Sequence, residues 1–203
     1  MGDAGDVALI DAGGANLGSV RYALDRLGVV PRLVRDADAL GSPDRIILPG
    51  VGAAAPAMAL LQERGLDASL RHLQVPLLGI CLGMQLLYEG SDEGDVACLG
   101  LLPGRVWAMP PSPGLRVPHM GWNALVPLRA SPLLDGIEPG AQVYFVHGYA
   151  ASVDAHCIAG CEHGAPFAAI VGQGRVAGMQ FHPERSAAVG ARLLANFLSW
   201  TPA

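Results

Sequence analysis

One cysteine in the sequence has the neighbours of a catalytic nucleophile. Cys81 lies between Gly79 and Gly83, after the apolar segment 76–80. Glycine two positions before and two after a nucleophile is typical of a sharp strand-to-helix turn, where larger side chains would collide with neighbouring backbone. A helix N-terminus favours a thiolate, and the amide of Leu82 could stabilise an oxyanion there. A buried structural cysteine beside two packing glycines is the alternative.

A cysteine nucleophile needs a base, and the base needs a third group that holds its tautomer. Among the six histidines, His182 stands out because it follows an apolar segment and precedes Pro183, which favours an extended conformation. In an extended chain residues i and i+2 point the same way, so Glu184 could bind one ring nitrogen while the other faces Cys81. Alone, these two residues could be a strand end and a helix N-terminal charge. Together with the cysteine turn they predict a catalytic triad.

A second oxyanion donor is expected from another loop at the same edge of the sheet. The sequence Pro-Gly-Val-Gly at 49–52 follows an apolar segment. Its glycines, Gly50 and Gly52, allow backbone amides to turn into a pocket. An ordinary strand-to-helix turn is the alternative at this position.

The elements that would position these residues alternate between strand and helix in the first half of the chain. Strands are predicted at 7–10, 32–34, 45–48 and 76–80, and helices at 16–27, 53–61 and 82–89. Continuously apolar strands that alternate with helices predict a parallel sheet covered on both faces.

The second half consists mainly of short strands separated by Pro and Gly turns. Strands are predicted at 105–109, 122–126, 142–146, 155–159, 167–171 and 176–180, with a hairpin turn at 172–174 and a closing helix at 186–200. We expect these strands to extend the sheet in antiparallel fashion or to form a small second layer. The predicted fold class is therefore α/β, with a mixed, mostly parallel central sheet, in one domain over 1–203.

Composition excludes several functions. The chain has 203 residues and 13 basic residues, all of them arginine, which excludes every mechanism that needs a lysine. The net charge is −5 and no basic cluster is visible, so we expect no nucleic-acid partner. No apolar run reaches the length of a transmembrane helix, and the N-terminal segment opens with acids, unlike a secretory signal. With only four cysteines, unevenly spread, we expect a cytoplasmic protein.

Two other motifs have the appearance of binding sites. Segment 11–18 is similar to a dinucleotide-binding turn, but Ala15 occupies the second glycine position, so a plain βα turn is favoured. Segment 156–163 contains two histidines and two cysteines. In a strand at ~3.3 Å per residue, Cys157 and Cys161 would lie about 13 Å apart, too far to share a zinc ion. We expect a strand with a turn at 163–164 and no metal.

The motifs together resemble those of the class I, or triad, glutamine amidotransferases. The matching segments are 49–52, 79–85 and 180–184, in the family's order and spacing, and the resemblance covers nearly the whole chain. Three further segments resemble one branch of that family, the glutaminase subunits of imidazole glycerol phosphate synthase: 86–94, 118–123 and 144–149. The triad is family-wide, and the His-Met-Gly-Trp-Asn stretch at 119–123 indicates the branch.

This resemblance implies a flavodoxin-like fold and hydrolysis of L-glutamine to glutamate and ammonia through a cysteine thioester, without a cofactor. It implies that Cys81 attacks the side-chain amide, that His182 protonates the leaving ammonia and later activates water, and that Glu184 orients His182. It assigns further residues to the substrate or its oxyanion: Gly50, Gly52, Leu82, Gln85, Gly148 and Tyr149.

The resemblance also implies a heterodimer. The partner would be the barrel-shaped cyclase subunit of imidazole glycerol phosphate synthase, which uses the ammonia to form imidazole glycerol phosphate and an aminoimidazole carboxamide ribotide in histidine biosynthesis. The residues implied near that subunit are Asn16, His119, Met120, Trp122, Asn123 and Tyr144.

Three features depart from the family's usual pattern. They are the loop 12–18, Gly148 in place of a serine, and Arg185 in place of a lysine. They affect the partner face and the substrate rim rather than the triad. Two other hypotheses stay open: a glutaminase that serves a pyridoxal phosphate, anthranilate or GMP synthase, and a non-catalytic scaffold for a barrel subunit. The intact triad argues against the scaffold.

Overall fold

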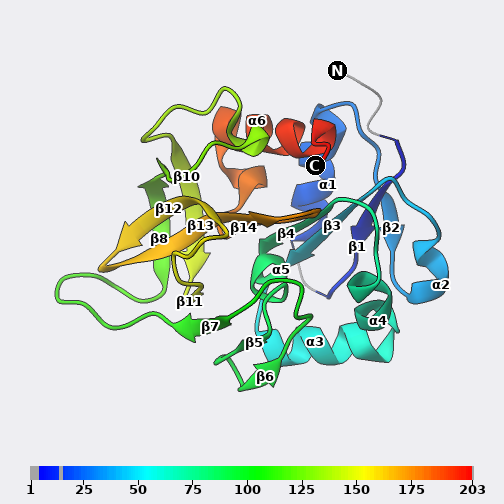
Figure 1. Ribbon diagram of the computed structural model, residues 1–203, viewed down its shortest axis with the longest axis horizontal. Helices are drawn as coiled ribbons and strands as arrows, with labels where there is room; N and C mark the ends of the chain where they lie inside the picture. The colour runs from blue at the N-terminus through cyan, green and yellow to red at the C-terminus, as the bar shows by residue number, and fades with distance from the viewer. Residues whose placement is uncertain (1–4, 14–15, 203) are drawn as a thin grey trace.

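The computed structural model describes residues 5–13 and 16–202, and its centre is an eight-stranded sheet (Figure 1). The strand order is β2-β1-β3-β4-β14-β13-β12-β9. The first five of these strands run parallel: β2 (Arg32–Val34), β1 (Val7–Ile10), β3 (Arg45–Gly50), β4 (Leu77–Cys81) and β14 (Val176–Met179). The other three are antiparallel additions: β13 (Ala165–Gln173), β12 (Cys157–His163) and β9 (Val126–Pro127). The predicted mixed, mostly parallel sheet is confirmed.

Helices cover both faces of this sheet because its strands are apolar on both sides. In β1, Val7 and Leu9 belong to one buried cluster and Ala8 and Ile10 to the other. The first cluster also includes apolar residues of α1 (Leu17–Arg26) and α6 (Ala187–Ser199), and the second those of α3 (Ala54–Glu63) and α4 (Leu66–Arg71). The short helix α2 (Ala37–Leu40) follows β2. Alternating burial on two faces explains why these strands read as continuous apolar runs.

Two smaller sheets complete the fold. One pairs β8 (His119–Ala124) with β10 (Gln142–His147) in antiparallel register, at the end of the molecule opposite α2 (Figure 1). The other contains four short strands: β5 (Gly90–Ser91), β6 (Val96–Ala97), β7 (Arg105–Ala108) and β11 (Tyr149–Ala150). The 3-10 helices are η1 (Pro132–Leu134) and η2 (Pro183–Arg185). Some predicted second-half strands therefore extend the main sheet, and others form separate layers.

One predicted helix is much shorter than its sequence suggested. The prediction extended it over 82–89, but α5 spans only Leu82–Gln85. The carbonyl groups of Leu86, Leu87 and Tyr88 accept hydrogen bonds from amides in the loop 99–102. Because those carbonyls are bound to a distant loop, they are taken out of the helical hydrogen-bond pattern and the helix ends.

Neither a membrane span nor a metal cluster is found in the part of the chain that the structure describes. No helix there combines the length and the apolar character that crossing a bilayer requires. No group of three or more His, Cys, Asp or Glu side chains there is arranged to hold a metal ion. In the segment 156–163 the predicted strand and turn are confirmed, because β12 ends at His163 and pairs directly with β13. In the segment 11–18, Gly14 and Ala15 lie outside the described residues.

Candidate active site

The turn between β4 and α5 presents Cys81 in a strained conformation. Its φ is 53° and its ψ is −113°, a region that residues other than glycine seldom adopt. A Cβ atom on Gly83 would lie 1.8 Å from the carbonyl oxygen of Leu48, and one on Gly79 would lie 2.6 Å from the carbonyl oxygen of Gly83. Glycine is therefore required on both sides of Cys81, and the predicted strand-to-helix turn is confirmed.

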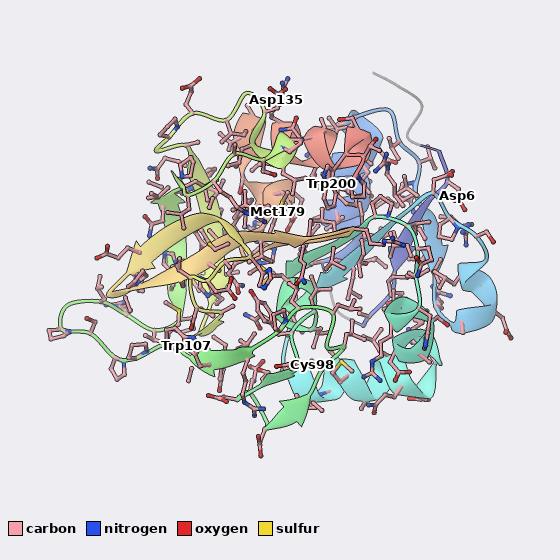
Figure 2. The ribbon with its side chains drawn as sticks, viewed as in Figure 1. Asp6, Cys98, Trp107, Asp135, Met179 and Trp200 are labelled. Carbon is pink, nitrogen blue, oxygen red and sulfur yellow. The ribbon has the colours of Figure 1, made fainter. Side chains whose placement is uncertain are left out.

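His182 and Glu184 follow β14, whose last residue, Met179, lies near the middle of the molecule (Figure 2). Nδ1 of His182 lies 2.7 Å from Oε1 of Glu184, and both side chains are buried. Because a carboxylate only accepts, Nδ1 carries the proton. Nε2 is buried too, and no described residue meets the geometric criteria for a hydrogen bond to it. This tautomer leaves Nε2 as the nitrogen that can exchange a proton with a substrate.

Asn16 binds the same carboxylate. Its Nδ2 donates to Oε1 of Glu184 at 2.7 Å and lies 3.2 Å from Nδ1 of His182. The family resemblance placed Asn16 only near the partner, so this contact with the triad is a finding of the structure. Two donors on one oxygen hold the carboxylate, and through it the imidazole, in a single orientation.

The charge of His182 depends on its two neighbours. Burial lowers the pKa of His182, but its contacts with Cys81 and Glu184 outweigh burial and raise that pKa to about 10. The imidazole is therefore protonated at neutral pH when it faces the cysteine. A cation beside a thiol stabilises the thiolate, which is the nucleophilic form of cysteine.

A pocket of about 210 Å³ opens onto Cys81 and His182. Five of the six residues that the resemblance assigned to the substrate line it: Gly52, Leu82, Gln85, Gly148 and Tyr149. The sixth, Gly50, pairs with Cys81 in the sheet instead, and a Cβ atom there would lie 2.8 Å from the backbone nitrogen of Gly83. In the structure Gly50 therefore supports the turn and does not line the pocket.

Four pocket-lining residues were not predicted from the sequence: Val51, Glu93, Val146 and His147. Glu93 is the acidic one, and its Oε2 accepts from the amide of Ala54 at the start of α3, at 2.9 Å. Segment 86–94 carried part of the family resemblance, which was the only sequence signal for this residue. A fixed carboxylate at the pocket wall favours a ligand with a positive group.

The residues that the resemblance placed near a partner fall into two sets. Met120 and Trp122 are 66% and 52% exposed on the outer face of β8. Tyr144 on β10 makes an edge contact with Trp122, and Arg185 lies over the Tyr144 ring at 5.3 Å from its centroid. His119 is buried instead, and its side chain contacts that of His147.

That histidine pair consists of His147, which lines the pocket, and His119, which does not. Nδ1 of His119 lies 3.1 Å from Nε2 of His147, and Nδ1 of His147 lies 2.9 Å from the carbonyl oxygen of Tyr149. Asn123 reaches the other ring nitrogen of His119 at 3.4 Å and also donates to the carbonyl of Glu162. Since a carbonyl only accepts, Nδ1 of His147 is a donor. Burial keeps both imidazoles neutral, so Nε2 of His147 carries no proton and accepts from Nδ1 of His119. Burial lowers the pKa of His119 to about 4 and that of His147 to about 3.

These lowered pKa values predict that the protein loses stability in acid. In the unfolded chain both histidines would titrate near their usual pKa of about 6.5. Because protonation then favours the unfolded state, the stabilisation present above pH 6.5 is lost as the pH falls toward 4. The loss is up to about 1.4 kcal/mol per pH unit for each histidine. Urea unfolding between pH 7 and pH 4 measures it, and His119→Phe should give a shallower profile. An unchanged slope in that variant would contradict the assignment.

The four cysteines differ in environment, and this predicts selective labelling. Burial raises the pKa values of Cys98, Cys157 and Cys161 to about 11. Cys81 is the one that lines the pocket beside a protonated imidazole. Iodoacetamide at pH 7.5 should therefore modify Cys81 in the folded protein, with the other three reacting at most about one-hundredth as fast. Peptide mass mapping checks this, and equal labelling of all four would contradict it.

Comparisons with known proteins agree with this geometry. The family model described as Glutamine amidotransferase class-I matches residues 8–200. The chain is 66% identical to the imidazole glycerol phosphate synthase subunit HisH of Xanthomonas oryzae pv. oryzae and 65% identical to that of Xylella fastidiosa, in each case over 95% of this chain and 96% of the relative.

Solved structures share the fold. A crystal structure of a glutamine amidotransferase superimposes with a TM-score of 0.73 at 22% identity, over 95% of this chain and 96% of that one. A structure of PurLQS from Thermotoga maritima gives a TM-score of 0.71 at 22% identity, over 96% and 98%. The chain therefore belongs to the class I glutamine amidotransferases and, within them, to the HisH subunits of imidazole glycerol phosphate synthase.

Proposed function

We propose that this chain hydrolyses L-glutamine to glutamate and ammonia, with Cys81 as nucleophile, His182 as acid and base, and Glu184 as the residue that orients His182. The observation that carries the proposal is one arrangement: a strained cysteine at the pocket, in contact with an imidazole whose far nitrogen is bound to a buried carboxylate. These are the three parts that nucleophilic catalysis by cysteine requires.

The first half of the reaction forms a thioester. The Cys81 thiolate attacks the side-chain carboxamide carbon of glutamine, and the C=O electron pair moves onto oxygen. The amide of Leu82, at the start of α5, would donate to that oxyanion, and the turn at 51–52 lines the same pocket. His182 gives its Nε2 proton to the nitrogen as the C–N bond breaks, so ammonia leaves and a glutamyl thioester remains.

The second half restores the enzyme. His182, now neutral, takes a proton from water while the water oxygen attacks the thioester carbon. The C–S bond breaks, the new γ-carboxyl group gives its remaining proton to solvent as glutamate is released, and the thiolate and the imidazolium are regenerated together. The contact of Glu184 with Nδ1 stabilises the imidazolium at both ends of the cycle.

Substrate selection follows from the charges at the pocket wall. We assign Glu93 to the α-ammonium group of glutamine, because its carboxylate lines the pocket and is held by the amide of Ala54. Gln85, Gly148 and Tyr149 line the same pocket and would complete the site for the amino-acid end. No cofactor is needed, since each proton and electron pair moves between the substrate, water and the triad.

The ammonia would be used by a partner. We assign that role to the cyclase subunit of imidazole glycerol phosphate synthase, because the similar proteins of Xanthomonas oryzae pv. oryzae and Xylella fastidiosa are named as HisH subunits of that synthase. The exposed Met120 and Trp122 on β8 are the surface we assign to it. The four cysteines are free, which fits a reducing compartment, and we place the complex in the cytoplasm.

Glutamate release measured with and without the cyclase tests this function. We expect slow hydrolysis by the isolated chain, because we expect the oxyanion site to be completed only when the ligand-bound cyclase is in place. With the cyclase and its bound ligand the rate should be about 100-fold higher or more, which is the effect of adding one oxyanion donor. Subunits of pyridoxal phosphate, anthranilate and GMP synthases serve as controls and should not raise the rate. Full activity of the isolated chain would contradict partner activation, and no release with the ligand-bound cyclase would favour a non-catalytic scaffold.

A further inference from the structure

Two buried carboxamides lie behind the nucleophile. Gln85 is in α5, and Gln180 follows β14 and is fully buried. Nε2 of Gln85 donates to the carbonyl oxygen of Tyr149 at 2.9 Å and to Oε1 of Gln180 at 3.0 Å. Nε2 of Gln180 lies 3.9 Å from Sγ of Cys81. The three side chains therefore form one chain of contacts that ends on the sulfur atom.

The orientation of each carboxamide in this chain is determined by the one before it. A backbone carbonyl can only accept, so Gln85 must turn its NH₂ group toward Tyr149, whose carbonyl also accepts from His147. The second hydrogen of that NH₂ group requires an acceptor, so Gln180 must turn its oxygen toward Gln85. The NH₂ group of Gln180 then has to face the opposite way, toward Cys81.

We propose that Gln180 is a positioning residue that directs an N–H toward the Cys81 thiolate, and that Gln85 and the Tyr149 carbonyl hold it in that orientation. This role of Gln180 rests on the proposed function, in which Cys81 is the nucleophile, and it adds a residue that contacts the sulfur atom. The triad alone supplies one donor, the imidazole of His182. Gln180 supplies a second donor, from the segment after β14, two residues before His182.

The surroundings of the sulfur show why a second donor matters. The carbonyl oxygen of Val146 also lies 3.9 Å from Sγ of Cys81. That oxygen can accept from the neutral thiol but repels the thiolate, so it favours the unreactive form. An N–H from Gln180 opposes this effect because a hydrogen bond to the charged form favours it. Since Gln180 is fully buried, water does not replace this donor when the side chain is changed.

The pH profile of Cys81 alkylation tests the proposal without depending on glutamine turnover. The full-length chain is treated with iodoacetamide from pH 5 to pH 10, and modification of Cys81 is followed by mass spectrometry. In Gln180→Met, which removes the donor at similar length, we expect Cys81 to react about tenfold more slowly at pH 7 and the midpoint of the profile to move upward. Gln180→Glu adds a negative charge beside the sulfur and should have the larger effect.

Gln173→Glu is the matched control. It makes the same change of charge at an exposed position at the far end of β13, and the alkylation profile should not change. A purely structural role for Gln180 would lower the melting temperature of both Gln180 variants and leave the midpoint where it was. If Gln180→Glu does not fold, Gln180→Met decides the question.

An unchanged midpoint and rate in folded Gln180→Met would overturn the proposal. Failure of the proposed function is a separate result, because it would appear as glutamine hydrolysis that persists in Cys81→Ala. In the cyclase complex, Gln180→Met should lower kcat about tenfold with KM nearly unchanged, since the lost contact is to the nucleophile and not to bound glutamine.

Discussion

Glutamate release should fall by a factor of about 10⁴ to 10⁶ when Cys81 is replaced by alanine, the loss typical of removing a nucleophile that works as part of a triad. Alanine has no atom that can form the thioester, so hydrolysis can proceed only by direct attack of water. The measurement is glutamate production by the complex with the cyclase. When ammonium salts replace glutamine, synthesis by the same complex should continue at its usual rate, because the cyclase site is unchanged.

Cys98→Ala is the control for this substitution. Cys98 is also a buried cysteine, in the loop after β6 (labelled in Figure 2), and it does not line the pocket. Its loss should therefore reduce stability by about 1 kcal/mol and leave hydrolysis intact. If Cys81→Ala still hydrolyses glutamine at an appreciable rate while Cys98→Ala does not, the nucleophile has been assigned to the wrong cysteine.

Gly83→Ala should damage both stability and activity, although it adds a single methyl group. The added Cβ atom would lie 1.8 Å from the carbonyl oxygen of Leu48, and a backbone atom cannot rotate away as a side chain can. Strand β3 and helix α5 must therefore separate, with a loss of about 3 kcal/mol or more in the free energy of unfolding. Displacement of Cys81 by about 1 Å should also reduce kcat about 100-fold. Urea denaturation and the glutaminase assay measure the two effects.

Gly18→Ala is a matched control for this variant. Gly18 is also a helical glycine, in α1, but apart from its chain neighbours and the backbone of its own helix no atom lies within 4 Å of the Cβ position there. The same substitution should stabilise the protein by up to about 1 kcal/mol, because alanine favours helix more than glycine does. If both alanine variants behave alike, the collision with Leu48 does not control the turn.

Local patterns in the sequence were sufficient for the centre of the fold and for the triad. The strands β1 and β2 have the predicted bounds because apolar runs between turn residues are a short-range signal. The turn at Cys81 could be predicted because its two glycines stand within two residues of it. His182 and Glu184 could be paired because an extended backbone alone places alternate side chains on one side.

The surroundings of those residues depended on contacts between distant parts of the chain. Asn16 reaches Glu184 across 168 positions, and Gln180 reaches Cys81 across 99. The early end of α5 depends on a loop that begins at Leu99. No periodicity or spacing encodes such pairs, because they exist only after the sheet has placed β14 next to β4 and has brought β1 within two strands of β4. The sequence therefore determined which groups could carry out the chemistry, and the tertiary structure decided which neighbours orient them and tune their charge.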